Sequence, residues 1–236
     1  MLDGVKGIIF DLDGTMVDSM WMWRGIDEEF MAARGLEMTD DLELAIEGMS
    51  FRETAEYFVR TYPLTESVEE LMDIWVQMAI DKYQHEVPVK PGLMHFLDEM
   101  KAHGIRMGIA TSNARILLDA VAGAHGFYDY MDGVLTANEV KRGKPAPDVF
   151  LAVSDKIGVA PADCLVFEDI PQGIRAGIAA GMKVCAVSDE YSRAQENEKR
   201  ALAHYYIDSY EQVLDGTYEV TSSRRQSLRA TCPKRT

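Results

Sequence analysis

The sequence predicts an α/β protein in which a mostly parallel sheet carries a separate helical insertion. Short apolar runs alternate with helical patterns, as in parallel sheets whose crossovers are helices. About 90 residues without a strand pattern separate the first two runs, and the length of 236 residues suits one large domain or a core with an inserted smaller one. The expected strands are residues 7–10, 106–110, 133–135, 164–167 and 183–187, with a weaker one at 205–207.

Helical signals fill the gap between the first two strands. Ser50-Phe-Arg-Glu53 and Ser67-Val-Glu-Glu70 both fit a capping box, in which a hydroxyl and a carboxylate satisfy unpaired amides at a helix start. Apolar residues then recur at helical spacing, which predicts buried helix faces. These residues are Trp23, Ile26, Phe30 and Met31, and then Leu71, Ile74, Trp75 and Met78. We therefore predict a helical domain over residues 17–85.

The remainder predicts the α/β core, formed by residues 1–16 and 86–215. Helices are expected over 91–104, 147–158 and 171–180, because each stretch begins near a proline and ends near a glycine. From residue 216 the composition becomes polar and basic, and we interpret 216–236 as a flexible tail.

Composition and charge exclude several classes of protein. The formal net charge of −15 repels a polyanion at long range, so we expect no nucleic-acid partner, although a local site can still bind a small anion. No run approaches the roughly 18 apolar residues of a membrane span, and no signal peptide is visible. We expect a soluble, cytoplasmic protein, and the oligomeric state stays open. Its three cysteines, Cys164, Cys185 and Cys232, are odd in number, so no disulfide framework is implied. Cys164 and Cys185 lie in apolar runs, which indicates small buried apolar residues.

Two carboxylates follow the first predicted strand, in Asp11-Leu-Asp13-Gly-Thr15. Residues two apart on a strand point the same way, and ligands of open parallel sheets bind at the carboxyl ends of strands. Two adjacent carboxylates repel each other unless a cation lies between them or one holds a proton. The pattern therefore favours a cation site, although a turn rich in Asp, or an Asp that caps the next helix, would also fit.

Three later segments place further polar side chains at strand ends or at a helix start. Each is a weak signal alone, but together they supply what phosphoryl transfer needs: a nucleophilic carboxylate, hydroxyl and ammonium groups for phosphoryl oxygens, and hard ligands for Mg2+. The segments are Thr111-Ser112-Asn113, Lys144 within Gly-Lys-Pro-Ala-Pro-Asp, and Glu168-Asp169.

In residue type, order and strand context, these four motifs resemble those of the haloacid dehalogenase superfamily, over about residues 5–215. The helical insertion resembles the cap of the subgroup that contains phosphoglycolate phosphatase and β-phosphoglucomutase. The resemblance implies a Rossmann-like core with an inserted all-helical cap domain. It also implies a Mg2+-dependent phosphatase of a small phosphorylated metabolite, such as a sugar phosphate.

The same resemblance implies a role for each motif residue. Asp11 would attack phosphorus, and Asp13 would protonate the leaving oxygen and then activate water. Thr111 and Lys144 would hold phosphoryl oxygens, with Ser112 and Asn113 as further substrate-binding residues. Mg2+ would bind Asp11, the main-chain carbonyl of Asp13, Asp169 and, directly or through a water molecule, Glu168.

Two alternatives to a phosphatase remain. A β-phosphoglucomutase-like mutase would carry a His after the first motif and a Lys after the Thr motif, where this chain has Trp23 and Ala114. Arg52 resembles the phosphate-binding arginine of such mutases, but its spacing is one residue off. A catalytically silent relative would have lost a motif residue, and none is lost. The phosphatase is therefore favoured.

Overall fold

One sheet organises the part of the chain that the computed structural model describes, which is residues 1–38, 42–46 and 51–221. Within these residues seven strands lie in the order β3-β2-β1-β4-β5-β6-β7, and all neighbouring pairs are parallel except β6 and β7. The six predicted strands and the parallel sheet are confirmed. The strands are β1 (Gly7–Phe10), β2 (Arg106–Thr111), β3 (Gly133–Thr136), β4 (Cys164–Glu168), β5 (Lys183–Val187), β6 (Tyr205–Ile207) and β7 (Glu219–Val220).

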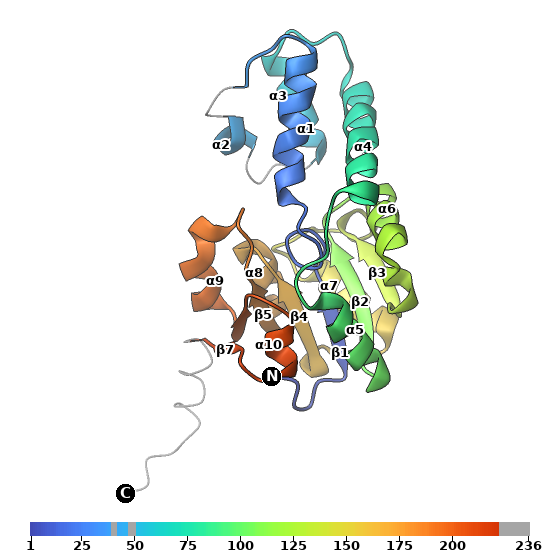
Figure 1. Cartoon of the computed structure of the whole chain (residues 1–236), viewed down its shortest axis with the longest axis vertical. Helices are drawn as coiled ribbons and strands as arrows, with labels where there is room; N and C mark the ends of the chain where they lie inside the picture. The colour runs from blue at the N-terminus through green and yellow to red at the C-terminus, as the bar shows by residue number, and fades with distance from the viewer. Residues whose placement is uncertain (39–41, 47–50, 222–236) are drawn as a thin grey trace, which may run out of the picture.

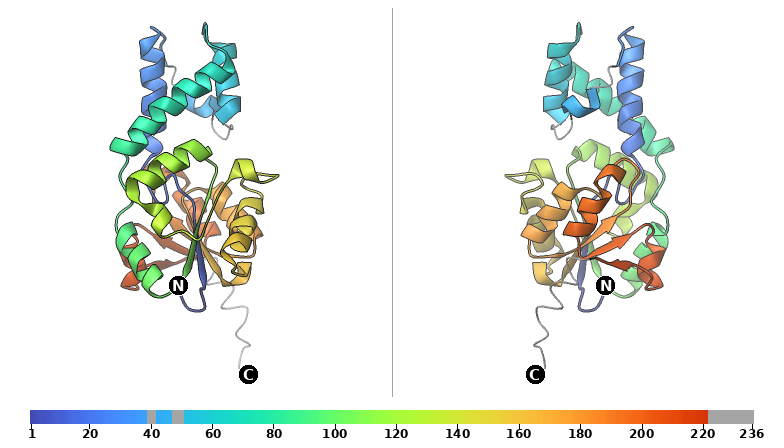
Figure 2. Two further views of the ribbon diagram at one scale, coloured as in Figure 1. Left: turned by 90° about the vertical axis from the view of Figure 1, so that its right-hand side faces the viewer. Right: turned by 90° about the vertical axis from the view of Figure 1, so that its left-hand side faces the viewer.

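Helices cover both faces of the sheet (Figure 2). Along β1, Ile8 and Phe10 pack on one face with α5, α6 and α10, whereas Ile9 packs on the other face with α7 and α8. The alternation follows from the two-residue period of a strand. The predicted helices after residue 86 are confirmed. The core helices are α5 (Leu93–Ala102), α6 (Arg115–His125), α7 (Asp148–Ile157), α8 (Pro171–Ala179), α9 (Glu196–Leu202) and α10 (Glu211–Leu214).

The register of the central strands brings their carboxyl ends level. Phe10 of β1 is aligned with Ile109 of β2 and with Phe167 of β4. The rings of Phe10 and Phe167 stack at a centroid distance of 5.4 Å, and both are fully buried. Burial of each ring stabilises the fold by about 2–3 kcal/mol. This packing holds the carboxyl ends of β1 and β4 in place, and the residues that follow them are positioned by it.

In the described part of the segment between β1 and β2, four helices form a cap at the carboxyl end of β1, away from the N-terminus (Figure 1). They are α1 (Met20–Ala33), α2 (Leu42–Ile46), α3 (Phe51–Thr61) and α4 (Val68–His85). Their core is aromatic, with the rings of Phe58 and Trp75 edge to face at 4.9 Å. The capping box at Ser67 is confirmed, whereas the one at Ser50 lies outside the described residues.

Two adjacent segments connect the cap to the core. Val17 forms an antiparallel bridge with Val89, and the Asp18 N–H donates to the Pro88 carbonyl at 2.9 Å. The chain thus enters and leaves the cap at one place, directly beside the residues that follow β1.

The interpretation of the chain from residue 216 onward as a flexible tail is wrong for its first part. Glu219 and Val220 form β7, which pairs antiparallel with β6, and Thr221 is buried. The ring of Tyr218 packs edge-on against Tyr205 at 5.5 Å. These apolar contacts and the free edge of β6 explain the added strand. Residues 222–236, with Cys232, lie outside the described residues.

Candidate active site

The first site residues lie in the tight loop that follows β1. The Asp11 N–H donates to the Phe167 carbonyl at 3.0 Å, which extends the strand pairing by one residue. The chain then turns at Gly14, which has a φ of +77°, and the Gly14 N–H donates to the Val17 carbonyl at 2.9 Å. A side chain at this position would be strained in the left-handed region. The turn leaves Asp11 and Asp13 at the base of the cap.

Three carboxylates meet at the carboxyl ends of β1 and β4. Asp11, Glu168 and Asp169 are buried, and each offers an oxygen within 4.8 Å of the others. Glu168 is the last residue of β4, so the chain can leave the strand and turn Asp169 toward the same centre. The end of the strand thus lets two consecutive acids face one centre.

Lys144 joins this cluster from the loop before α7. Its ammonium donates to Asp11 Oδ1 at 2.5 Å and to Glu168 Oε1 at 2.8 Å. The ammonium also lies 4.9 Å from the ring centroid of Phe150 on α7. Of the two acids that it contacts, Asp11 has a side chain 10% exposed and Glu168 one 1% exposed. Asp11 is therefore the more accessible of the two.

The charges of the cluster are not balanced. Burial raises the pKa of Asp11 to about 8, against the attraction of Lys144 and with the repulsion of Glu168. Burial and repulsion by Glu168 raise the pKa of Asp169 well above its usual value. Burial opposes the charge of Lys144, but Asp11 and Glu168 outweigh it and raise the pKa of the ammonium. Three carboxylates and one ammonium leave a formal charge of −2, which a divalent cation would neutralise.

Two glycines make room for the carboxylates. A Cβ at Gly14 would lie 2.3 Å from Asp169 Oδ2, and one at Gly173 would lie 1.5 Å from Glu168 Oε1. Both are far shorter than a van der Waals contact, so neither position accepts a side chain without moving an acid. Gly173 sits in the first turn of α8, and its lack of a Cβ lets the helix approach β4 at the cluster.

Asp13 lies in a second polar group, between the core and the cap. Ser19 Oγ donates to Asp13 Oδ1 at 2.6 Å, and Asn113 Nδ2 donates to Asp13 Oδ2 at 2.9 Å. The hydroxyl of Tyr83, on α4, donates to Asp13 Oδ1 and accepts from Asn113 Nδ2 at 2.8 Å. Burial and the neighbouring Asp13 charge raise the pKa of Tyr83 well above its usual value, so its hydroxyl stays protonated.

Neither Tyr83 nor Ser19 was predicted from the sequence to belong to the site. Tyr83 belongs to the buried face of α4, four residues beyond Ala79, and that spacing indicates burial but not a polar contact. Ser19 precedes α1, as a capping residue would, but its hydroxyl bonds Asp13 instead of the helix.

The other predicted residues lie at the edge of these two groups. Thr111 ends β2, is buried, and its Oγ1 accepts from the Asn113 N–H at 3.0 Å. Ser112 is exposed, so its role stays a prediction. Arg52 pairs with Glu69 on the cap surface at 2.7 Å rather than with any of the predicted site residues.

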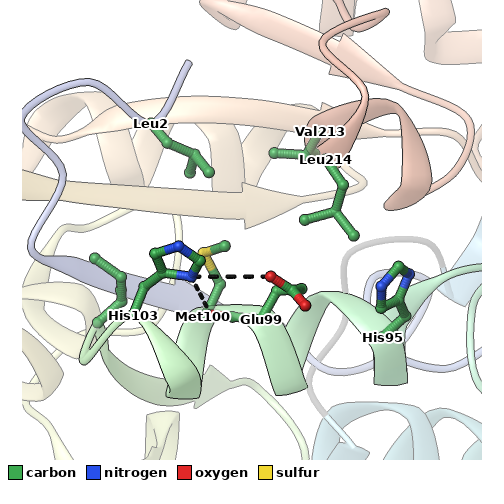
Figure 3. A pocket seen from close by; sticks show the side chains of 8 residues that line it. Leu2, His95, Glu99, Met100, His103, Val213 and Leu214 are labelled. Carbon is green, nitrogen blue, oxygen red and sulfur yellow. Dashed lines mark hydrogen bonds and ion pairs between the residues drawn. The ribbon is translucent and has the colours of Figure 1, made fainter.

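A pocket of about 510 Å3 lies elsewhere, between α5 and α10 (Figure 3). Apolar side chains such as Leu2, Met100 and Leu214 line much of it, and it contains none of the residues that the sequence singles out. Cys164 and Cys185 are buried free thiols, as predicted. No helix in the described part of the chain is both long enough and apolar enough to pass through a membrane.

Comparisons with known proteins find relatives over most of the chain. Residues 8–187 match the family described as haloacid dehalogenase-like hydrolase. Hexitol phosphatase A of Escherichia coli is 30% identical over 214 residues, which cover 84% of this chain and 90% of that protein. The bifunctional riboflavin kinase/FMN phosphatase of Arabidopsis thaliana is 29% identical over 181 residues, or 76% of this chain, and the match spans 48% of that longer protein.

The fold has close counterparts among solved structures. The crystal structure of CbbY from Rhodobacter sphaeroides in complex with phosphate superposes with a TM-score of 0.76 at 23% identity. The superposition covers 87% of this chain and 95% of CbbY. A Rossmann-like core with a helical cap is thus the architecture of both proteins.

Proposed function

Because the chain belongs to the haloacid dehalogenase-like hydrolases, we propose that it is a Mg2+-dependent phosphatase that uses an aspartyl-phosphate intermediate. Its substrate would be a small phosphomonoester, such as a sugar phosphate. The observation that carries the proposal is one buried centre that joins Asp11, Lys144, Glu168 and Asp169 beside Asp13. The similarity to hexitol phosphatase A supports a phosphorylated small molecule as the substrate class.

Asp11 is the nucleophile in this proposal. One of its oxygens attacks phosphorus, the bond from phosphorus to the leaving oxygen breaks, and Asp13 gives its proton to that oxygen. Water then attacks the aspartyl-phosphate, gives a proton to Asp13 and releases phosphate, which restores both carboxyl groups. The greater exposure of Asp11 than of Glu168 supports the choice of nucleophile.

Lys144 would neutralise charge on the phosphoryl group. Its contact with Asp11 Oδ1 puts an ammonium beside the atom that would bond phosphorus. Thr111 and Ser112 would donate to the phosphoryl oxygens from the end of β2, next to β1 in the sheet. Asn113 would instead orient Asp13, because its side-chain N–H groups donate to Asp13 and to Tyr83. Since little covalent chemistry is required beyond attack and proton transfer, such positioning supplies much of the rate.

The carboxylate cluster fits a magnesium ion. Asp11, Asp169 and Glu168 would hold it, with the main-chain carbonyl of Asp13, since carboxylate and carbonyl oxygens are its preferred protein ligands. When bound, Mg2+ supplies positive charge that offsets the phosphate and the carboxylates. Both Glu168 oxygens already accept hydrogen bonds, from Lys144 and the Ile170 N–H, whereas Asp169 Oδ1 accepts one from Thr15. Asp169 is therefore the stronger candidate ligand.

Hydrolysis of p-nitrophenyl phosphate tests the proposal. Wild-type protein should release p-nitrophenolate with Mg2+ and not with EDTA. Asp11→Asn should lower kcat at least a thousandfold with an unchanged melting temperature, because an amide keeps the shape but cannot attack phosphorus. Asp163→Asn, which changes an exposed acid paired with Lys6, is the matched control and should be active.

A kcat for Asp11→Asn within tenfold of wild type would contradict the assignment of the nucleophile. The substrate class is then read from phosphate release across a panel of phosphorylated metabolites. With β-glucose 1-phosphate and a trace of the bisphosphate, a phosphatase releases inorganic phosphate, whereas a mutase accumulates glucose 6-phosphate. Faster formation of glucose 6-phosphate than of phosphate would replace the phosphatase by the mutase.

A further inference from the structure

We propose that Tyr83 of the cap is a positioning residue for Asp13. By donating to Oδ1 of Asp13, the Tyr83 hydroxyl leaves Oδ2 of Asp13 as the oxygen that transfers the proton. The inference rests on the proposed function, because it assumes that Asp13 is the acid and base. It concerns a cap residue that lies outside the four motifs.

The contacts differ between the two oxygens of Asp13. Oδ1 accepts from Ser19 Oγ at 2.6 Å and from the Tyr83 hydroxyl, whereas Oδ2 accepts from Asn113 Nδ2 at 2.9 Å. A carboxylate oxygen has about two lone pairs for hydrogen bonds. Within residues 1–38, 42–46 and 51–221, the lone pairs of Oδ1 are therefore occupied and one lone pair on Oδ2 is left.

Asn113 fixes which side that open lone pair faces. Its amide nitrogen donates to Asp13 Oδ2 and to the Tyr83 hydroxyl at 2.8 Å, while its oxygen accepts from the Ala114 N–H at 2.8 Å. Its own N–H donates to Thr111 Oγ1. Oδ2 is thus held on the side of the Thr111 segment, where the phosphoryl group would lie.

Packing in the cap holds the ring of Tyr83 in place. The residue is 1% exposed, and its ring packs edge-on against Trp23 of α1 with a centroid distance of 6.5 Å. A Phe at this position would keep the ring contacts and remove the hydroxyl alone. Ser19, which is fully buried, offers a second and independent way to remove a donor from the same oxygen.

A consequence follows for the cap. Ser19 lies at the entrance to α1 and Tyr83 lies near the end of α4, so both donors to Oδ1 lie at the two junctions of the cap with the core. Asp13 is fully held only when both junctions are placed as they are here. The acid–base group is thereby completed by the docked cap.

The test compares two substrates of similar shape, phenyl phosphate and p-nitrophenyl phosphate. Phenolate leaves poorly without a proton, whereas p-nitrophenolate hardly needs one. A whole acid–base group contributes about 100- to 10,000-fold. Tyr83→Phe should therefore lower kcat/KM about tenfold for phenyl phosphate and less than about threefold for p-nitrophenyl phosphate.

Three further variants make the result specific. Ser19→Ala should give the pattern that is expected for Tyr83→Phe, and it tests the inference even where Tyr83→Phe does not fold. Asp13→Asn should show the pattern with a larger loss. Tyr130→Phe removes another tyrosine hydroxyl that donates to a carboxylate, that of Asp98 at 2.8 Å, and should change neither substrate.

Equal losses on both substrates for Tyr83→Phe and Ser19→Ala, or no loss on either, would overturn the inference. A merely structural role would lower both rates together. Wild-type protein that hydrolyses neither substrate would overturn the proposed function, and this inference with it.

Discussion

Magnesium should raise the melting temperature of this protein, and the size of the shift can be worked out. The buried carboxylates of Asp11, Glu168 and Asp169, with Lys144, carry a formal charge of −2 when ionised. An ion that binds the folded state alone stabilises it by about 2.7 kcal/mol at a hundredfold excess over its Kd. For a chain of this size we therefore expect a rise of about 5–10 °C.

The assay is thermal unfolding in EDTA and at increasing Mg2+ concentration. Asp169→Asn should abolish the shift without lowering the melting temperature in EDTA, because the neutral amide removes a repelling charge from the cluster. Glu168→Gln should weaken the shift less, since both Glu168 oxygens are engaged by other donors. Asp163→Asn should keep the full shift. A full shift in Asp169→Asn would refute the assignment of the cluster as the metal site, and a stronger effect of Glu168→Gln would exchange the two roles.

Two further predictions concern pH and packing. In EDTA the free energy of unfolding should fall as pH rises from about 4 to about 8, because the folded state binds more protons than the unfolded state when the pKa of Asp11 is raised from 3.8 to about 8. The rise in melting temperature caused by Mg2+ should grow over the same pH range. A rise that does not depend on pH would contradict the assignment of the buried carboxylates as ligands. Gly173→Ala should lower kcat at least tenfold, because its Cβ would lie 1.5 Å from Glu168 Oε1. Gly177→Ala in the same helix is the control, because its added Cβ would contact Val184 and not Glu168. This variant should be less stable, but its folded form should keep its activity. Similar activities for the two folded variants would show that Glu168 is not held tightly.

The sequence was sufficient for the parts of the site that depend on strand ends. Phe10 and Phe167 lie in apolar runs, so Asp11 and Glu168 had to follow buried strands, and a parallel sheet brings such ends to one edge. The strand formed by Glu219 and Val220 could not be predicted in the same way. It is two residues long, and it depends on the free edge of β6 rather than on a pattern of its own.

The group around Asp13 shows where sequence reasoning ends. Tyr83 is 70 positions away from Asp13 in the sequence. The spacing of Leu71, Trp75 and Ala79 predicts a buried face for its helix, and these three residues pack in the core of the cap. Nothing in that spacing separates a ring that fills space from a ring whose hydroxyl reaches a carboxylate. The difference arises from docking, because Val17 pairs with Val89 and thereby brings the end of α4 down onto the loop after β1. A buried hydroxyl requires a partner, and Asp13 is the partner that this docking supplies. The hydrogen bond that gives the buried Tyr83 hydroxyl its partner therefore also orients Asp13, the proposed acid. The packing of the cap thus affects the proposed chemistry through Asp13 Oδ1.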